Sequence, residues 1–287
     1  MTVIITAQQV KELREITGAG ILDAKKALVE VDGDLEKAME LLRQKGMASA
    51  DKKMSRIAAE GVVYSYVNNN VAAMVEVNCE TDFVAKNEDF KALVDIIART
   101  VADNNPSDLE ILNDLKSDGT TIETLVKEAI STIGEKITIR RFVRYEGTIA
   151  TYIHNNKIGV LLEVEGNDAA MAKDICLHIA SSGSEFVSRT EIPQSVIDEE
   201  TRIEMGKEDL ASKPENIRAK IVEGRVNKLM SQRVLLEQPF VKNPDQTIEQ
   251  LIAGKLTIKR FSKYTLGEGL EKRQENFAEE VMNQIKN

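Results

Sequence analysis

The sequence predicts a mixed α+β protein with a small helical head, a duplicated α+β core and a helical insertion within the second copy of that core. Three observations carry this prediction. Helix-start patterns with helical apolar spacing occupy the first 46 residues, a strand–turn–strand pattern occurs twice, and the second copy contains extra residues of helical periodicity. A chain of 287 residues is long enough for two to three such units.

The beginning of the chain predicts three short helices. Thr6 and Gln9 have the spacing of a capping box, and the helix that they begin can end at Gly18. A second helix is expected from Ile21, and Asp34 can cap a third. The residues expected to face the core of this head are Val10, Leu13 and Thr17, then Ile21, Ala24, Leu28 and Val31, and finally Leu35, Ala38, Met39 and Leu42.

The following part of the chain is predicted to be duplicated. EGVVYSYVNNN (residues 60–70) resembles EGTIATYIHNN (residues 146–156), which lies 86 positions later in the chain. After one inserted residue in the second copy, the match continues with a separation of 87 positions. Apolar residues alternate on both sides of an Asn-rich turn in each copy, which is typical of a β-hairpin. A helix is expected next, over residues 90–98 in the first copy and 171–180 in the second.

The repeat extends beyond these helices. TIETLV (residues 121–126) pairs with TIEQLI (residues 247–252), and KITIRRF (residues 136–142) pairs with KLTIKRF (residues 255–261). Each copy is therefore expected to contain two strands, a helix, a further helix and a last strand. Such a unit is an α+β layer in which the helices cover one face of a sheet.

The two copies differ in length at two places. The first has five extra residues within residues 78–87, and the second has 37 extra residues between Ala180 and Lys255. The longer insertion predicts a helical hairpin similar to a short antiparallel coiled coil, which could pack a second subunit or cover its own domain. Its apolar seam is expected at Val196, Ile203 and Leu210, then at Ile217, Ile221, Val222, Val226 and Leu229, with a capping-box pattern at Ser212 and Glu215 between them.

Several classes of function are excluded by what the sequence lacks. Two cysteines, Cys79 and Cys176, and two histidines, His154 and His178, are too few for a disulfide framework or a zinc cluster. No phosphate-binding glycine motif, membrane-length apolar stretch or signal-peptide layout is present. The net charge of −9 argues against nucleic-acid binding by the whole protein. We therefore expect a cytoplasmic, non-enzymatic protein that binds a partner protein and needs no metal, cofactor or membrane.

The most specific motif follows the second predicted strand. It reads TDFVAKN (residues 81–87) and resembles the hallmark motif of the elongation factor Ts family. The resemblance extends over essentially the whole chain, although Ile21 and Leu22 stand where some members are rich in Met. Further matching motifs are LR at residues 13–14, TGAG at 17–20, DAKKAL at 23–28, IGE at 133–135, EGR at 223–225, QPFV at 238–241 and GEG at 267–269.

This resemblance implies a division of the chain into domains. The head is expected to be similar to a ubiquitin-associated fold, and the inserted hairpin to be a dimerisation coiled coil. The implied boundaries are 1–46 for the head, 47–58 for a linker with some helical content, 59–145 for the N-subdomain of the core, 146–183 with 236–266 for the C-subdomain, 184–235 for the coiled coil and 267–287 for a C-terminal helical module.

The resemblance also implies a function. The protein would be a guanine-nucleotide exchange factor that binds elongation factor Tu in both its GDP-bound and nucleotide-free forms. In this family the TDFV segment reaches the partner's nucleotide site and helps dislodge its magnesium ion. That role falls on Thr81, Asp82, Phe83 and Val84, which we call the finger (residues 81–84). Contacts of the head fall on Leu13, Thr17, Gly18, Ala19, Gly20 and Ile21, and a contact on the core surface falls on His178.

The residue types in the finger suit this role. Phe83 can insert between partner side chains, and Asp82 can perturb a Mg²⁺ ion, which requires near-octahedral coordination. Taken alone, the same two residues would more often be a core phenylalanine and a helix N-cap, and the glycines of residues 17–20 could simply cap and turn. The five-residue surplus over the second copy, together with the matching family motif, favours the finger.

Two other functions stay open at this stage. The protein could be an interaction scaffold whose head binds peptides while the core spaces it. It could also bind RNA through the basic strand ends at residues 140–144 and 259–263, where alternation puts Arg140, Phe142 and Arg144 on one strand face. The glycine pattern of an RNA-recognition sheet is absent, so these residues serve equally well as a solvated sheet face.

Overall fold

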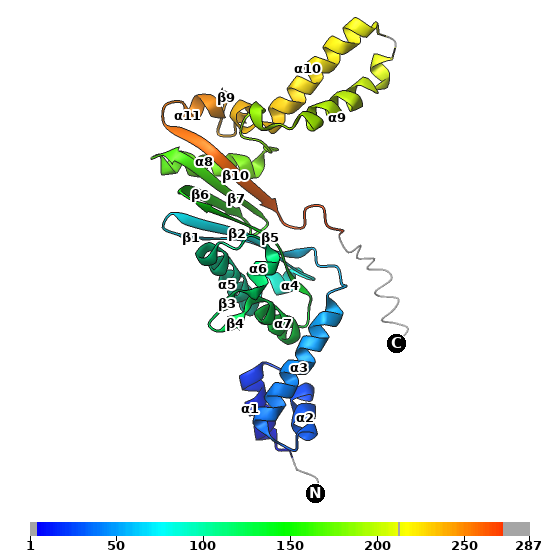
Figure 1. Cartoon of the computed structure of the whole chain (residues 1–287), viewed down its shortest axis with the longest axis vertical. Coiled ribbons are helices and arrows are strands. Elements are labelled where there is room, and N and C mark those ends of the chain that lie inside the picture. Colours follow the sequence, from blue (N-terminus) through cyan, green and yellow to red (C-terminus); the bar gives the residue numbers. More distant parts are fainter. Residues whose placement is uncertain (1–4, 212, 272–287) are drawn as a thin grey trace. The chain divides into compact units, whose positions relative to one another are not determined.

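The structure is a computed structural model that describes residues 5–211 and 213–271. It divides into two units (Figure 1). Among the described residues, the first unit comprises 5–66, 73–143 and 265–271, and the second comprises 67–72 and 144–264 except residue 212. Each unit mixes helices with small sheets, so the predicted α+β class is confirmed.

The head of the first unit consists of the three predicted helices, α1 (Ala7–Thr17), α2 (Ile21–Glu30) and α3 (Leu35–Lys53). The capping box is present: Thr6 Oγ1 accepts from the Gln9 backbone N–H at 3.3 Å, and Gln9 Oε1 accepts from the Thr6 N–H at 3.0 Å. Asp34 Oδ1 caps α3 at 3.1 Å from the Lys37 nitrogen. The buried residues of the head core are Val10, Leu13, Ala24, Ala27, Leu28 and Ala38.

One detail of the head differs from expectation. Ile21 does not face the core but is 58% exposed, because it is the first residue of α2 and lies ahead of the stripe that Ala24, Ala27 and Leu28 bury. Helix α3 continues to Lys53, which agrees with the helical content expected at the start of the linker. Gly46 allows α3 to pack closely on α7 (Ile122–Ile133), because a Cβ at that position would lie 2.9 Å from Ser131 Cβ.

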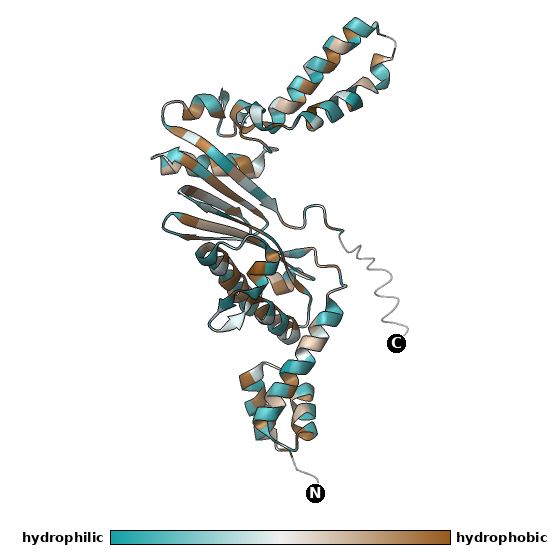
Figure 2. Ribbon diagram, in the orientation of Figure 1, coloured by the Kyte–Doolittle hydropathy of each residue, from teal (hydrophilic) through white to brown (hydrophobic). Residues whose placement is uncertain are grey.

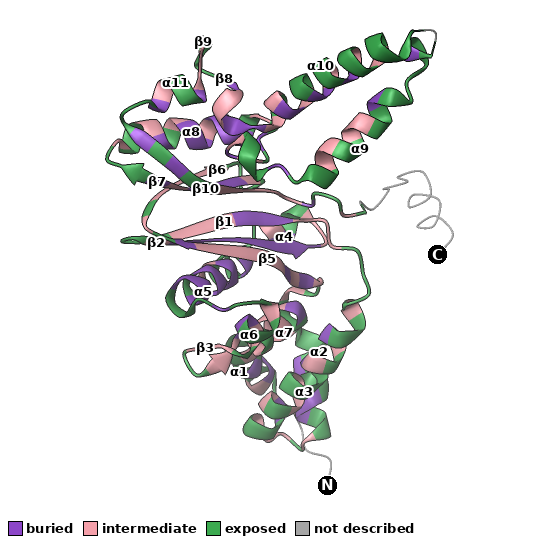
Figure 3. Cartoon of the chain, turned by 45° about the horizontal axis from the view of Figure 1, so that its top comes forward, coloured by how far each residue is buried: buried purple, intermediate pink, exposed green. Residues whose placement is uncertain are grey.

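The first copy of the duplicated core forms a sheet of order β1-β2-β5, built from β1 (Glu60–Asn68), β2 (Val71–Cys79) and β5 (Ile137–Glu146). Helix α5 (Glu88–Asn104) lies beside this sheet (Figure 3), and its buried residues include Phe90, Ile97 and Val101. The shorter elements of this copy are α4 (Asp82–Ala85), α6 (Leu109–Asp114), β3 (Lys116–Ser117) and β4 (Thr120–Thr121).

The second copy repeats this arrangement within the second unit. Its sheet has the order β10-β7-β6, formed by β6 (Thr148–His154), β7 (Ile158–Gly166) and β10 (Leu256–Thr265). Helix α8 (Ala169–Ser181) packs on β6 and β7, and α11 (Ile248–Ile252) precedes the last strand as α7 does in the first copy. The predicted order of two strands, helix, helix and strand is thus confirmed in both copies.

The insertion in the second copy is a helical hairpin of α9 (Gln194–Met205) and α10 (Glu215–Arg233) (Figure 1). Both helices are largely hydrophilic, with hydrophobic residues recurring along them (Figure 2). The short elements around the hairpin are the 3-10 helices η1 (Arg189–Glu191), η2 (Glu208–Leu210) and η3 (Leu235–Glu237) and the strands β8 (Pro239–Phe240) and β9 (Asn243–Thr247).

The seam of the hairpin agrees with the prediction only in part. Its buried residues include Leu210, Val222 and Val226, as expected, and also Met230. Ile203 and Ile217 are 50% and 46% exposed, so their expected place in the seam is wrong. Helix α10 begins at Glu215, and Pro214 occupies its N-cap position without a side-chain capping bond. Ser212, the expected cap, lies outside the described residues.

Candidate functional site

The finger lies where the chain leaves β2. Thr81 is the N-cap of α4, its Oγ1 accepting from the Val84 backbone N–H at 3.4 Å. Helix α4 is a single turn, and Asn87 then caps α5 by accepting from the N–H groups of Asp89 and Phe90. An isolated helical turn is unstable in water because nucleation fixes several dihedral angles for one hydrogen bond. The direction of the finger therefore depends on its anchors.

The side chains of the finger separate into an outward and an inward set. Phe83 is 80% exposed, whereas Val84 is only 9% exposed and anchors the turn. Asp82 is also exposed and forms an ion pair of 2.6 Å with Lys86, whose ammonium lies 5.9 Å from the centre of the Phe83 ring. The alternative of a core phenylalanine with Asp82 as the N-cap is wrong, since Thr81 is the cap and Phe83 points into solvent. Val84 cannot make an extensive contact with a partner, because its side chain faces inward.

Two carboxylates hold the base of the finger. Glu135, which follows α7, accepts from the Thr81 N–H at 2.9 Å and from the Thr81 hydroxyl at 2.7 Å. Glu80 accepts from the Lys136 N–H at 2.7 Å and pairs with Arg56 at 3.2 Å. Glu135 thus binds the backbone of the residue that follows Glu80, and Glu80 binds the backbone of the residue that follows Glu135. This reciprocal pair of bonds clamps residues 80–81 to residues 135–136. The IGE motif at residues 133–135 was quoted in the sequence analysis, but no signal there indicated a contact with the finger.

Cys79 completes the anchoring of Thr81. Its thiol donates to the Thr81 carbonyl oxygen at 3.1 Å, so the N–H, hydroxyl and carbonyl of Thr81 all have partners. Burial and the nearby carboxylate of Glu135 raise the pKa of Cys79 to about 12. The thiol therefore stays protonated near neutral pH and acts as a donor, not as a nucleophile.

The head loop, residues 17–20, is a second exposed candidate surface. Gly18 ends α1 at φ +67°, and Arg14 Nε donates to the Ala19 carbonyl at 3.2 Å. Three large apolar side chains around this loop are exposed, Ile16 at 52%, Ile21 at 58% and Leu22 at 70%. The sequence analysis missed Ile16 and Leu22. Their position off the stripe of core residues was the signal that could have identified them.

Two predicted contact residues are buried. Leu13 is fully enclosed in the head core, so it supports the head loop instead of contacting a partner. His178 is 3% exposed, so its expected position on the core surface is wrong. It is held inside by two hydrogen bonds, because its Nε2 lies 2.8 Å from Gln238 Oε1 and its Nδ1 accepts from the Val241 N–H at 3.2 Å. Burial lowers the pKa of His178 although its hydrogen bond to Gln238 opposes this.

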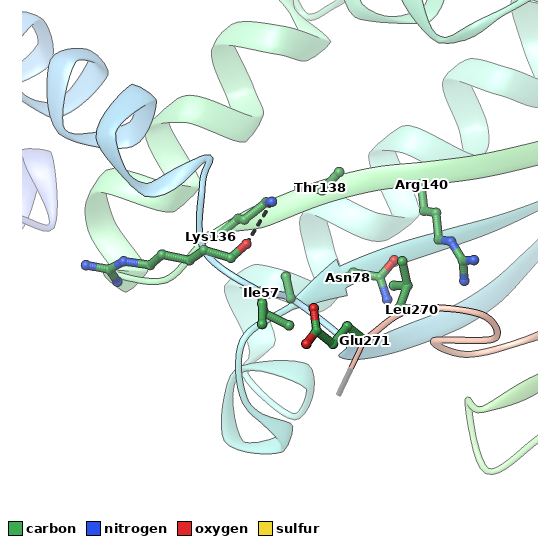
Figure 4. Close-up of a pocket in the computed structure, with 9 residues that line it drawn as sticks. Ile57, Asn78, Lys136, Thr138, Arg140, Leu270 and Glu271 are labelled. Atoms are coloured by element: carbon green, nitrogen blue, oxygen red, sulfur yellow. Dashed lines mark hydrogen bonds between the residues drawn. The ribbon is translucent and has the colours of Figure 1, made fainter. Parts of the chain in front are cut away.

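A pocket of about 250 Å³ lies beside the base of the finger in the first unit (Figure 4). Two buried polar atoms there, Asn78 Oδ1 and Thr138 Oγ1, have no hydrogen-bond partner among the described residues. The basic groups around the pocket are already engaged: Arg56 pairs with Glu80, Arg140 pairs with a buried carboxylate, and Lys136 Nζ donates to the Arg56 carbonyl. We assign this pocket no chemistry.

The basic strand ends do not form an open cationic surface. Within β5, Arg140 and Arg141 both bind Glu76 at 2.8 and 2.6 Å. Within β10, the equivalent cations pair with carboxylates of β7, Lys259 with Glu165 and Arg260 with Glu163, both at 2.6 Å. RNA binding gains no support from this arrangement, since phosphate recognition requires available cations.

In the described part of the chain, residues 5–211 and 213–271, no group of three or more His, Cys, Asp or Glu side chains could hold a metal ion. None of the helices in this part of the chain combines the length and apolar character that crossing a membrane requires.

Comparison with known proteins decides the family. Residues 80–268, which include the whole finger, the second copy of the core and the part of the first copy that follows β2, match the family model described as elongation factor TS. The chain belongs to the elongation factor Ts family. It is 46% identical to elongation factor Ts of Alkalilimnicola ehrlichii and 47% identical to those of Thioalkalivibrio sulfidiphilus and Lacticaseibacillus casei. Each alignment covers 98% of this chain and 99% of the relative.

This membership establishes the general activity. The protein is a nucleotide-exchange factor for elongation factor Tu in translation elongation, and it is not an enzyme. The expected partner is therefore confirmed at the level of the family, and the scaffold alternative is superseded. Activity in translation elongation also agrees with the cytoplasmic location expected from the sequence.

Proposed function

We propose that the finger is the part of this exchange factor that acts on the nucleotide site of elongation factor Tu. The observation that carries the proposal is the exposure of Phe83, 80% on a turn whose base is clamped by Glu135. A large aromatic side chain in solvent gains free energy when a partner covers it. Phe83 is therefore suited to insert into the partner and shift the backbone around the bound phosphates.

Asp82 supplies the second component of the proposed mechanism. Its ion pair with Lys86 is exposed and contributes little stability, so this pair can open at small cost. A carboxylate brought near the Mg²⁺ of the GDP complex perturbs an ion that needs near-octahedral coordination and takes several of its ligands from phosphate and water. Magnesium and GDP then leave without covalent chemistry.

Release of GDP follows from linkage between the two binding events. A factor that binds the nucleotide-free partner more tightly than the GDP complex lowers the partner's affinity for GDP by the same ratio. GTP can then enter the open site. The head loop and its exposed neighbours Ile16, Ile21 and Leu22 form the second proposed contact, gripping the partner's nucleotide-binding domain while the finger acts.

The decisive measurement is the rate at which labelled GDP leaves elongation factor Tu in a stopped-flow instrument. The parent protein is expected to accelerate release strongly, and Phe83→Ala to reduce the accelerated rate by at least about tenfold, the scale for truncating an aromatic hot-spot residue. Ile111→Ala is the matched control, since it truncates an apolar side chain that is 48% exposed on α6, outside the finger. A folded Phe83→Ala protein as fast as the parent would contradict the proposal.

We also propose the domain assignment implied by the family, with a ubiquitin-associated-like head, two related core subdomains and an inserted coiled coil. Two capped helices, α7 and α11, support the relation between the subdomains, because Thr121 and Thr247 cap them in the same way. Of the proposed C-terminal module, residues 267–287, only residues 267–271 lie within the described part of the chain.

The inserted hairpin is proposed to pair two copies of the chain. Ile203, Met205 and Ile217 leave apolar surface exposed on α9 and α10, at 50%, 41% and 46%. Light scattering coupled to size-exclusion chromatography is expected to give the mass of a dimer for the parent and of a monomer for an Ile203→Lys, Ile217→Lys variant. A monomeric parent at high concentration would exclude the pairing.

A further inference from the structure

The loop between α7 and β5 provides a feature that the family relationship alone does not explain. Helix α7 ends at Gly134, which has φ +92° and donates its N–H to the Ile130 carbonyl at 3.0 Å. Glu135 follows immediately, and both of its carboxylate oxygens are occupied by Thr81. A carboxylate that accepts one backbone N–H and one hydroxyl makes two charge-assisted hydrogen bonds, which are stronger than neutral ones.

These bonds act on the conformation of the finger through the Thr81 hydroxyl. Because the hydroxyl hydrogen is directed at Glu135, a lone pair of the same oxygen is left for the Val84 N–H. Glu135 therefore orients the group that caps α4. The reciprocal bond from Lys136 N–H to Glu80 prevents the loop that carries Glu135 from moving away.

The duplication supplies an internal comparison. The segment before the last strand is shorter in the second copy, where Gly254 directly precedes Lys255 and has a positive φ as Gly134 does. No residue stands between this glycine and the lysine, so the second copy has no equivalent of Glu135. The second copy also lacks the five-residue surplus from which the finger is made. The carboxylate is thus present in the copy that has a finger and absent from the copy that has none. A role in the shared fold alone would not require this difference.

We propose that Glu135 is a positioning residue for nucleotide exchange, which fixes the direction in which Phe83 is presented to elongation factor Tu. This inference rests on the proposed function of the finger. Glu135 acts through Thr81 and need not touch the partner itself. The same end of α7 also supports the head loop, since a Cβ at Gly18 would lie 3.0 Å from Thr132 Cγ2. One helix end therefore holds both proposed contact surfaces of the first unit.

A double-mutant experiment tests this role. Glu135→Ala is expected to slow accelerated GDP release by about tenfold, the factor that corresponds to losing one or two hydrogen bonds to a charged group. In a Phe83→Ala background the same substitution is expected to change the rate by less than about twofold, because there is no aromatic ring left to position. A purely structural role would slow both backgrounds by the same factor and would overturn the proposal.

Three further variants serve as controls. Glu123→Ala removes an exposed carboxylate from α7, the helix that precedes Glu135, and is expected to leave release unchanged. Thr81→Val is expected to reproduce part of the loss, and Thr81→Ser, which keeps the hydroxyl, to restore the parent rate. If Glu135→Ala fails to fold, the comparison of Thr81→Val with Thr81→Ser tests the proposal instead. Equal rates of GDP release for these two variants would count against it.

The outcomes also separate this inference from the proposed function. If Phe83→Ala releases GDP as fast as the parent, the finger itself has been misassigned. If Phe83→Ala is slow while folded Glu135→Ala equals the parent, the finger stands and only the positioning role of Glu135 fails.

Discussion

Arg141 on β5 binds Glu76 on β2 at 2.6 Å, and the carboxylate of this ion pair is completely buried. Arg140 and the Gly267 N–H bind the same carboxylate at 2.8 and 2.9 Å. Burial opposes ionisation of Glu76, but these three donors outweigh it and hold its pKa below the ordinary value. The network therefore joins the sheet of the first copy to the GEG motif at residues 267–269, whose function the sequence analysis did not assign.

Removal of this carboxylate is expected to destabilise the first unit. Glu76→Gln removes the buried negative charge that the two guanidinium groups share. We expect the free energy of unfolding to fall by about 3 kcal/mol, near the lower end for breaking a buried pair because both arginines are partly exposed. The urea midpoint measures the loss, and amide hydrogen exchange in β2 localises it.

The second copy offers the matched control. Glu163 aligns with Glu76 and pairs with Arg260 at 2.6 Å, but the Arg260 side chain is 54% exposed. Solvent screens such a pair, so Glu163→Gln is expected to cost less than about 1 kcal/mol. Equal losses for the two substitutions would show that burial of Glu76 does not determine its contribution.

Two helical glycines are expected to respond in opposite ways to alanine. Gly224 lies within α10 with no atom within 4 Å of an added Cβ, so Gly224→Ala should raise stability by about 0.5–1 kcal/mol through helix propensity. At Gly46 the added Cβ would lie 2.9 Å from Ser131 Cβ, so Gly46→Ala should lower stability by about 1–3 kcal/mol through overpacking. Thermal unfolding followed by circular dichroism measures both, and a stabilising Gly46→Ala would contradict the close packing of α3 on α7.

Most of the fold was predictable from local sequence patterns, because helix caps and hairpins depend on residues only a few positions apart in the chain. The capping box at Thr6, the cap at Asp34 and the duplicated strand–helix order are all present in the structure. Periodicity was less reliable at the ends of elements. Ile21 and Ile203 have the spacing of core residues, but Ile21 is the first residue of α2, Ile203 lies in the last turn of α9, and both are exposed.

The candidate site was predictable only in its outward residues. The exposure of Phe83 follows from the surplus of residues in the first copy and from the motif. The contact between Glu135 and Thr81 joins residues 54 positions apart, and no local pattern encodes it. His178 was misplaced for a related reason: one sequence does not show that Gln238 and Val241 would enclose a polar ring.

The buried state of His178 predicts a pH dependence of stability. Burial lowers its pKa in the folded protein below the ordinary 6.5, so below that pH the unfolded chain binds a proton that the folded chain does not. Stability is therefore expected to be unaffected above pH 6.5 and to fall as the pH decreases towards the lowered pKa. The change in urea midpoint between about pH 7 and about pH 5 measures this effect.

A substitution isolates the contribution of this histidine. His178→Gln cannot titrate, and its amide can donate to Gln238 and accept from Val241 as the ring does. The variant is expected to be less dependent on pH over the same interval, whatever its absolute stability. An unchanged dependence would assign the effect to groups other than His178.

The two thiols are expected to be unreactive in the folded protein. Cys79 and Cys176 are fully buried, and burial raises the pKa of each to about 12, so almost no thiolate exists at pH 8. An aromatic disulfide reagent should release its coloured product from neither thiol under native conditions and from both in denaturant. Because Cys79 donates to the Thr81 carbonyl, early reaction of this thiol alone would mean that the base of the finger opens locally before the unit unfolds. Glu135→Ala should then accelerate reaction at Cys79 but not at Cys176, which links the thiol measurement to the clamp.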